Sequence, residues 1–70
     1  MRGWLKEART EKGLSMKQMG EKLDVSESYY SLIESGQRQK TMDITLVSKI
    51  SSALGVSVAE IVRLESMPDA

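Results

Sequence analysis

The sequence predicts an all-α fold, a single domain made of five short helices. Apolar residues recur at spacings of three and four in five separate segments, which is the period of a helix that buries one face. Serines suited to cap a helix precede several of these segments, and glycines suited to end one follow them. The β-branched run at residues 56–62 permits a strand, but Ala59 and Glu60 interrupt its alternation, so helix is favoured there.

The first two helices lie in the amino-terminal third of the chain. Leu5 and Ala8, three residues apart with Trp4 beside them, mark the first, and its pattern stops at Gly13. Ser15 is a good N-cap for the second helix, and a Gln three residues later completes a capping box. Its inward face is formed by Met16, Met19, Gly20 and Leu23.

A third helix is expected to follow after a very short turn. Asp24 tolerates the left-handed backbone that a tight turn requires, Val25 can plug the turn, and Ser26 can cap the next helix. This helix spans about residues 27–35 and ends at Gly36. Its inward face is formed by Tyr30 and Ile33.

Two more helices are expected after the polar loop "GQRQKT". The fourth has inward residues at helical spacing and stops at Gly55, and the fifth begins after the N-cap Ser57. Pro68 marks a tail. The apolar residues of these helices are Ile44, Val47, Ile50 and Leu54 in the fourth, and Val58, Ile61, Val62 and Leu64 in the fifth.

Composition excludes several classes of function. Seventy residues allow one domain, which buries only about 60% of the surface that its unfolded chain exposes. The chain has 40% hydrophobic and 29% charged residues, which is typical of a folded protein, and it has no Cys and no His. The usual general bases, nucleophiles and metal ligands are therefore missing. We expect no catalytic residue, no metal, no cofactor and no small-molecule ligand, and thus no enzyme.

The distribution of charge and of apolar residues indicates where the protein acts. No apolar run approaches the roughly 18 residues that a membrane span requires, and residues 1–13 become charged before a signal-peptide core could form. We expect a cytoplasmic protein without a membrane partner. Residues 1–40 hold eight Lys and Arg against six Asp and Glu, whereas residues 41–70 hold two against four. The amino-terminal part is therefore the better side for an anion.

The second and third helices form the most informative unit. A turn of about three residues forces two helices to cross steeply, and Gly20 lets their backbones approach closely. The outward face of the third helix carries small, uncharged and aromatic groups. Such a face suits a DNA major groove, because hydroxyl groups reach base edges or phosphates and apolar groups meet thymine methyls. Its residues are Glu27, Ser28, Tyr29, Ser31 and Leu32.

Two segments carry a resemblance to a known family. The segment "LSMKQMGEKLDVSESYYSLIESGQR", residues 14–38, resembles the helix-turn-helix domain of Cro and phage repressors, the Xre family, and "ISSALGVSVAEIV", residues 50–62, resembles that family's closing helices. The similarity covers about residues 4–64. It implies a five-helix, lambda-repressor-like domain over residues 1–70, with a core at about 4–64 and a tail at 65–70.

The resemblance also implies roles for individual residues. It places base contacts at Glu27, Ser28 and Leu32, and DNA-backbone contacts at Lys17, Gln18, Tyr29, Ser31, Arg38 and Lys40. It implies a partly buried ion pair between Arg9 and Glu34. For two of these residues packing is the alternative role: Tyr29 can pack in place of touching DNA, and Leu32 can form the edge of the core.

The chain departs from the family pattern at three places. Met16 stands where many members have a Gln that braces recognition, so that contact is expected to be absent or replaced by Lys17. Gly20 stands where Ala is usual, which preserves the packing but weakens the helix by roughly 1 kcal/mol. The loop after Gly36 is longer than the common form and lacks its usual Pro.

The resemblance implies a transcriptional regulator, expected to be a repressor, that binds double-stranded DNA as a homodimer at an inverted-repeat operator. Zero net charge implies low affinity for one subunit, which makes dimerisation important. The expected dimer contact is the carboxy-terminal half, through Leu46, Val62 and Leu64 outside the subunit core. The alternative is a protein-binding adaptor of the same fold, such as an anti-repressor, an antitoxin or an assembly partner.

Overall fold

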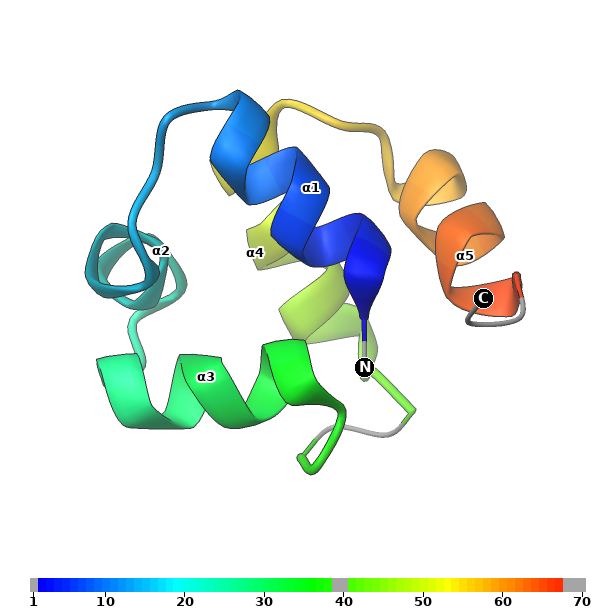
Figure 1. The fold of residues 1–70 in the computed structure, drawn as a ribbon. Coiled ribbons are helices and arrows are strands. Elements are labelled where there is room, and N and C mark those ends of the chain that lie inside the picture. Colours follow the sequence, from blue (N-terminus) through cyan, green and yellow to red (C-terminus); the bar gives the residue numbers. More distant parts are fainter. Residues whose placement is uncertain (1, 39–40, 68–70) are drawn as a thin grey trace.

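The predicted five helices are present. The computed structural model describes residues 2–38 and 41–67, and within them the chain is helical and has no strand (Figure 1). The helices are α1 (Gly3–Glu11), α2 (Met16–Leu23), α3 (Glu27–Ser35), α4 (Ile44–Leu54) and α5 (Val58–Ser66). Lys40 and Pro68, to which the sequence analysis gives a DNA contact and a place in the tail, lie outside the described residues.

Short polar side chains begin most of the helices, as predicted from the serines. Ser15, Ser26 and Ser57 each accept a hydrogen bond from the backbone N–H three residues later, at 3.0–3.1 Å. Asp43 caps α4 in the same way, with 2.8 Å between its Oδ1 and the N–H of Leu46. These caps satisfy N–H groups of the first turn that have no partner inside the helix.

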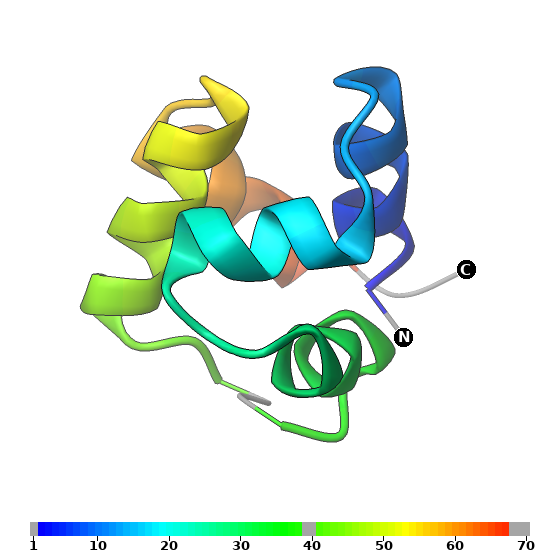
Figure 2. The same ribbon diagram turned by 90° about the vertical axis from the view of Figure 1, so that its left-hand side faces the viewer.

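The core is built from all five helices. Its members are buried apolar side chains from every helix. Helix α4 packs against α2 on one side and α5 on the other, and α1 lies across the core from α4 (Figures 1 and 2). The core residues are Leu5, Met19, Leu23, Tyr30, Ile33, Leu46, Val47, Ile50, Leu54 and Ile61.

The rotation of α4 differs from the expectation at two residues. Leu46 belongs to the core with 8% of its surface exposed, so its assignment outside the core, at a dimer contact, is wrong. Ile44, expected inside, is 71% exposed. Leu46 precedes Ile50 by four residues and Leu54 by eight, and therefore continues their row along the helix. Ile44 lies at the first position of α4 and off that row.

The end of α5 also differs from the expectation. The helix continues to Ser66, two residues into the segment expected as a tail. The side chain of Glu65 accepts a hydrogen bond from the indole N–H of Trp4, at 2.9 Å, which fixes this last turn against the amino-terminal segment.

Within residues 2–38 and 41–67, no single helix is long and apolar enough to cross a membrane. Helices α4 and α5 together have the length and apolar composition of a membrane span, but they are bent by 112° at the break between them. Buried core helices can have the same length and composition.

Candidate nucleic-acid interface

The turn between α2 and α3 sets the geometry of the candidate site. Asp24 adopts the left-handed conformation, with φ of 60°, and the N–H of Val25 donates to the carbonyl of Gly20 at 2.8 Å. A Cβ atom on Gly20 would lie 2.9 Å from the carbonyl oxygen of Val25, which is closer than side chains normally approach. The absence of a side chain at Gly20 therefore lets the turn fold directly onto α2, and α3 leaves at a steep angle (Figure 2).

The outward face of α3 is open to solvent at its amino-terminal end. Glu27 and Ser28 are exposed, and Tyr29, Ser31 and Leu32 are partly exposed. Tyr29 also packs against the core cluster, whereas Leu32 lies outside that cluster. The opposite face of α3 is closed, because Tyr30, Ile33 and Glu34 are buried. The helix thus presents a shallow surface of a carboxylate, hydroxyl groups and one leucine.

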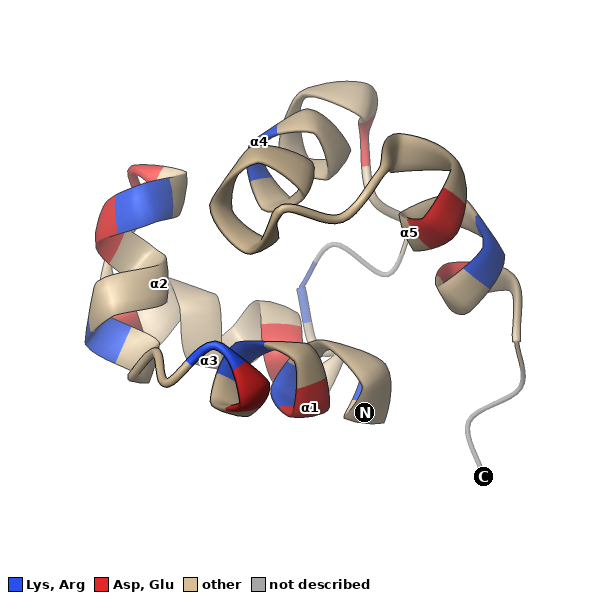
Figure 3. Ribbon diagram, turned by 90° about the horizontal axis from the view of Figure 1, so that it is seen from above, with Lys and Arg blue, Asp and Glu red and all other residues tan. Residues whose placement is uncertain are grey.

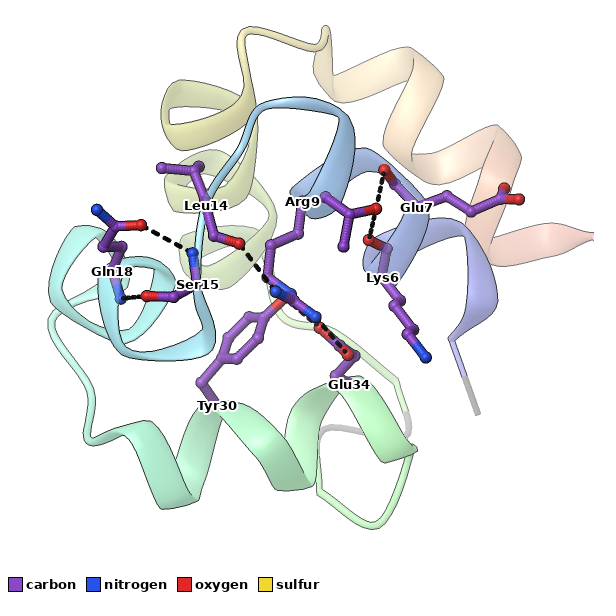
Figure 4. A network of polar contacts seen from close by, with 9 residues as sticks. Lys6, Glu7, Arg9, Leu14, Ser15, Gln18, Tyr30 and Glu34 are labelled. Atoms are coloured by element: carbon purple, nitrogen blue, oxygen red, sulfur yellow. Dashed lines mark hydrogen bonds and ion pairs between the residues drawn. The ribbon is translucent and has the colours of Figure 1, made fainter.

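Two exposed polar residues stand at the first turn of α2. Lys17 is exposed, and Gln18 forms a complete capping box with Ser15 (Figure 4). The backbone N–H of Ser15 donates to the amide oxygen of Gln18 at 2.8 Å. The cap engages the acceptor oxygen of Gln18 and leaves its NH₂ group as the donor for a phosphate.

The loop after α3 supplies the third part of the surface. Arg38 is exposed, and its backbone N–H and that of Gln37 both donate to the carbonyl of Leu32, at 3.2 and 3.0 Å. These bonds fix Arg38 to the last turn of α3. The carbonyl of Arg38 accepts a further hydrogen bond from the Arg2 guanidinium at 3.3 Å.

Charge is unevenly distributed over these elements. Helix α3 has no Lys or Arg, so positive charge near its exposed face comes from α2 and from the following loop. Helix α4 is mostly uncharged, with Lys49 as its one charged residue, whereas α5 carries both signs of charge (Figure 3). On α5 Arg63 is paired with Glu60. The hydrogen bond to Glu60 raises the pKa of Arg63. The carboxy-terminal helices therefore offer little to a polyanion.

A buried polar cluster supports α3 from behind. Glu34, 2% exposed, accepts from Arg9 Nε at 2.9 Å and from the Tyr30 hydroxyl at 2.8 Å (Figure 4). Arg9 Nη1 also donates to the carbonyl of Leu14 at 2.8 Å, so the guanidinium connects α1, α3 and the segment before α2. The hydrogen bond to Glu34 raises the pKa of Arg9, and burial, followed by the hydrogen bond to Glu34, raises that of Tyr30.

The raised pKa of Tyr30 predicts a loss of stability in alkali. The unfolded chain releases this proton near the ordinary value of 10.0, while the folded protein retains it. The contribution is therefore complete below pH 10 and should fall by about 1.4 kcal/mol per pH unit above it. Urea unfolding of the parent and of Tyr30→Phe from pH 8 to pH 11 measures the difference. Tyr29→Phe is the control, and a parent-to-variant difference that is constant with pH would contradict the raised pKa.

The structure reveals contacts that the sequence analysis missed. Arg2 is buried and bonded to Glu65, 63 residues away in the chain, and Lys49 Nζ donates to the carbonyl of Leu23 at the end of α2. The first contact pairs the carboxylate of Glu65 on α5, and the second satisfies a carbonyl at the end of α2. No local spacing indicates them, because each joins residues far apart in the sequence.

Exposed apolar side chains also occur on α4 and α5. Val62 is 53% exposed and Ile44 71%, whereas Leu64 is partly buried. Val62 also lines a pocket of about 260 Å³. The other lining residues are Thr41, Met42, Val47, Ile61, Glu65 and Ser66. In residues 2–38 and 41–67, no group of three or more acidic residues is placed to hold a metal ion.

Comparisons with known proteins agree with this geometry. A family model described as "Helix-turn-helix" matches residues 5–61, a range that includes α2, the turn and α3. The chain is 34% identical over 55 residues to the "Uncharacterized HTH-type transcriptional regulator YqaF" of Bacillus subtilis (strain 168). That alignment covers 79% of this chain and 70% of the relative. No solved structure matches.

Proposed function

The chain belongs to the Xre/Cro-type helix-turn-helix family of DNA-binding transcriptional regulators, and on this premise we propose that it is a repressor that binds a specific operator as a homodimer. The observation that carries the proposal is the exposed amino-terminal end of α3. Its inner face packs on the core, and its outer face is open to solvent and carries groups that can read base edges.

The proposed contacts divide into two classes. Glu27, Ser28 and Leu32 read bases: a carboxylate accepts from cytosine, a hydroxyl pairs with several base edges, and an apolar side chain meets the thymine methyl. The partly exposed position of Leu32 outside the core cluster supports this assignment. The contacts to the sugar-phosphate backbone are assigned to Lys17, Gln18, Tyr29, Ser31, Arg38 and Lys40.

The proposed assembly is a symmetric dimer on an inverted-repeat site. One subunit offers few base-reading side chains and has no Lys or Arg on α3, so one half-site provides little affinity. Two subunits would place their α3 helices about 34 Å apart, at successive turns of the major groove. Val62 and Leu64 on α5 are the proposed dimer contacts, and the dimer bound at its operator would occlude a promoter.

The division between base and phosphate contacts predicts different effects of substitution. Ser28→Ala or Leu32→Ala should change which bases are preferred. Lys17→Ala and Arg38→Ala should weaken all duplexes alike and lower the slope of log affinity against log salt by about one unit for each lost phosphate contact. The test is selection from a random duplex library, followed by salt titrations of each variant.

Lys22→Ala is the control for losing a positive charge outside the proposed phosphate contacts, because it removes an exposed Lys from the last turn of α2. It should leave the salt slope unchanged. An equal loss on every sequence after the joint substitution of Ser28 and Leu32 would place base reading elsewhere. Failure to enrich any duplex would reject the proposed function and favour the protein-binding adaptor.

A further inference from the structure

Arg2 joins the start of α1 to the end of α3. Its backbone N–H donates to the carbonyl of Glu34 at 2.8 Å, and its Nη1 donates to the carbonyl of Ile33 at 2.5 Å. The last carbonyls of a helix lie outside its internal hydrogen-bond ladder and carry partial negative charge. The buried guanidinium of Arg2 therefore caps the carboxy-terminal end of α3 and holds it against the start of α1.

The same guanidinium extends to the loop and to α5. Nη1 donates to the carbonyl of Arg38 at 3.3 Å, and Nε donates to Glu65 Oε1 at 2.7 Å. Trp4 Nε1 donates to the same oxygen at 2.9 Å, so Glu65 is held from two sides. The rigid fork of an arginine can make these contacts at once, whereas the single ammonium of a lysine cannot.

We propose that Arg2 and Glu65 are positioning residues for DNA binding. Glu65 orients the Arg2 guanidinium, and the guanidinium holds the backbone of Arg38 so that its side chain is placed for a phosphate. This inference rests on the proposed function, because it assigns Arg38 a DNA contact. It also gives α5 a second role besides the proposed dimer contact: Glu65 on this helix is connected to the end of α3 through the Arg2 guanidinium.

The DNA-binding test compares carboxylate variants on the same helix. Mixed-sequence duplex DNA is the probe, because a phosphate contact does not depend on sequence. Glu65→Ala should lower affinity about tenfold, the equivalent of one charge-assisted contact, and reduce the salt slope by about one. Glu65→Gln retains an acceptor for Arg2 and Trp4 and should restore most of the loss. Glu60→Ala removes a carboxylate on α5 that pairs with Arg63, and it should not weaken binding.

A double-mutant cycle separates positioning from a general loss of stability. In the Arg38→Ala background the side chain to be positioned is gone, so Glu65→Ala should have little further effect on the salt slope. Independent, additive losses in the cycle would overturn the proposal. Thermal unfolding of each variant, measured in parallel, establishes that all are folded at the temperature of the binding experiment.

Amide hydrogen exchange tests the connection without DNA. The N–H groups of Gln37 and Arg38, both bonded to Leu32, should exchange several-fold faster in Glu65→Ala than in the parent. The N–H of Met19, in α2, should be unchanged. Unchanged exchange at Gln37 and Arg38 would overturn the proposal. If the parent bound no duplex, the proposed function and the role in DNA binding would both be rejected, and the exchange result would decide whether α5 still holds the loop.

Discussion

Glu34→Gln is expected to destabilise the domain by about 3–5 kcal/mol, the range found when one partner of a buried ion pair is removed. Glu34 is 2% exposed and Arg9 8%. The amide would retain some hydrogen bonding but leave the Arg9 guanidinium without its counter-charge in a site that water scarcely reaches. Because small domains are stable by about 5–15 kcal/mol in total, this is a large fraction of what holds the fold together.

The expected loss has three structural causes. Arg9 Nε and Nη2 both point to the carboxylate, at 2.9 and 3.4 Å, so the variant loses a two-point contact. The Tyr30 hydroxyl loses a charged acceptor. Arg9 also holds the carbonyl of Leu14, so a shifted guanidinium disturbs the segment that leads into α2. Substitution of Glu34 should therefore disturb the positions of both α2 and α3.

Urea or thermal unfolding of parent and variant measures the effect. Glu60→Gln is the matched control, because Glu60 also pairs with an arginine but lies at the surface, where ion pairs contribute little. The double variant Arg9→Met with Glu34→Met should recover part of the loss, since apolar side chains can replace a buried pair without an unpaired charge. A melting temperature of Glu34→Gln within a degree or two of the parent would contradict this account.

Local chemistry explains which parts of the fold could be predicted. Ser15, Ser26 and Ser57 cap helices because their hydroxyl groups reach N–H groups three residues away, and Gly36 and Gly55 end helices with positive φ. These interactions lie within a few residues of each other, so the sequence displays them directly. The same holds for the short α2–α3 turn and for the exposed face that defines the candidate site.

Interactions between distant segments could not be predicted in the same way. The choice between Ile44 and Leu46 as a core residue depends on the rotation of α4 against its neighbours, which spacing alone leaves open. The bonds of Arg2 to Glu65 and to the end of α3 depend on the path of the whole chain. The resemblance to a family supplied the pairing of Arg9 with Glu34, which no local pattern indicates.

The proposed dimer predicts a large difference between one half-site and two. With both subunits held together, a second half-site should raise affinity by about 10²–10⁴, because the second binding event becomes intramolecular. The Val62 side chain is 53% exposed beside the pocket of about 260 Å³, and this surface carries little positive charge for DNA. An apolar contact between subunits would cover such a surface and leave α3 free to face the duplex.

Val62→Glu should therefore remove most of the gain from the second half-site while leaving half-site binding unchanged. Ser52→Glu adds the same charge at an exposed position of α4 and should preserve the gain. Titrations of a palindromic duplex and of its half-site, with sedimentation at micromolar protein with and without the palindrome, measure both quantities. A protein that stays monomeric in both conditions, and that binds the palindrome no more tightly than the half-site, would reject the dimer. That result would favour the alternative of a protein-binding adaptor, in which Tyr29 and Leu32 contact protein.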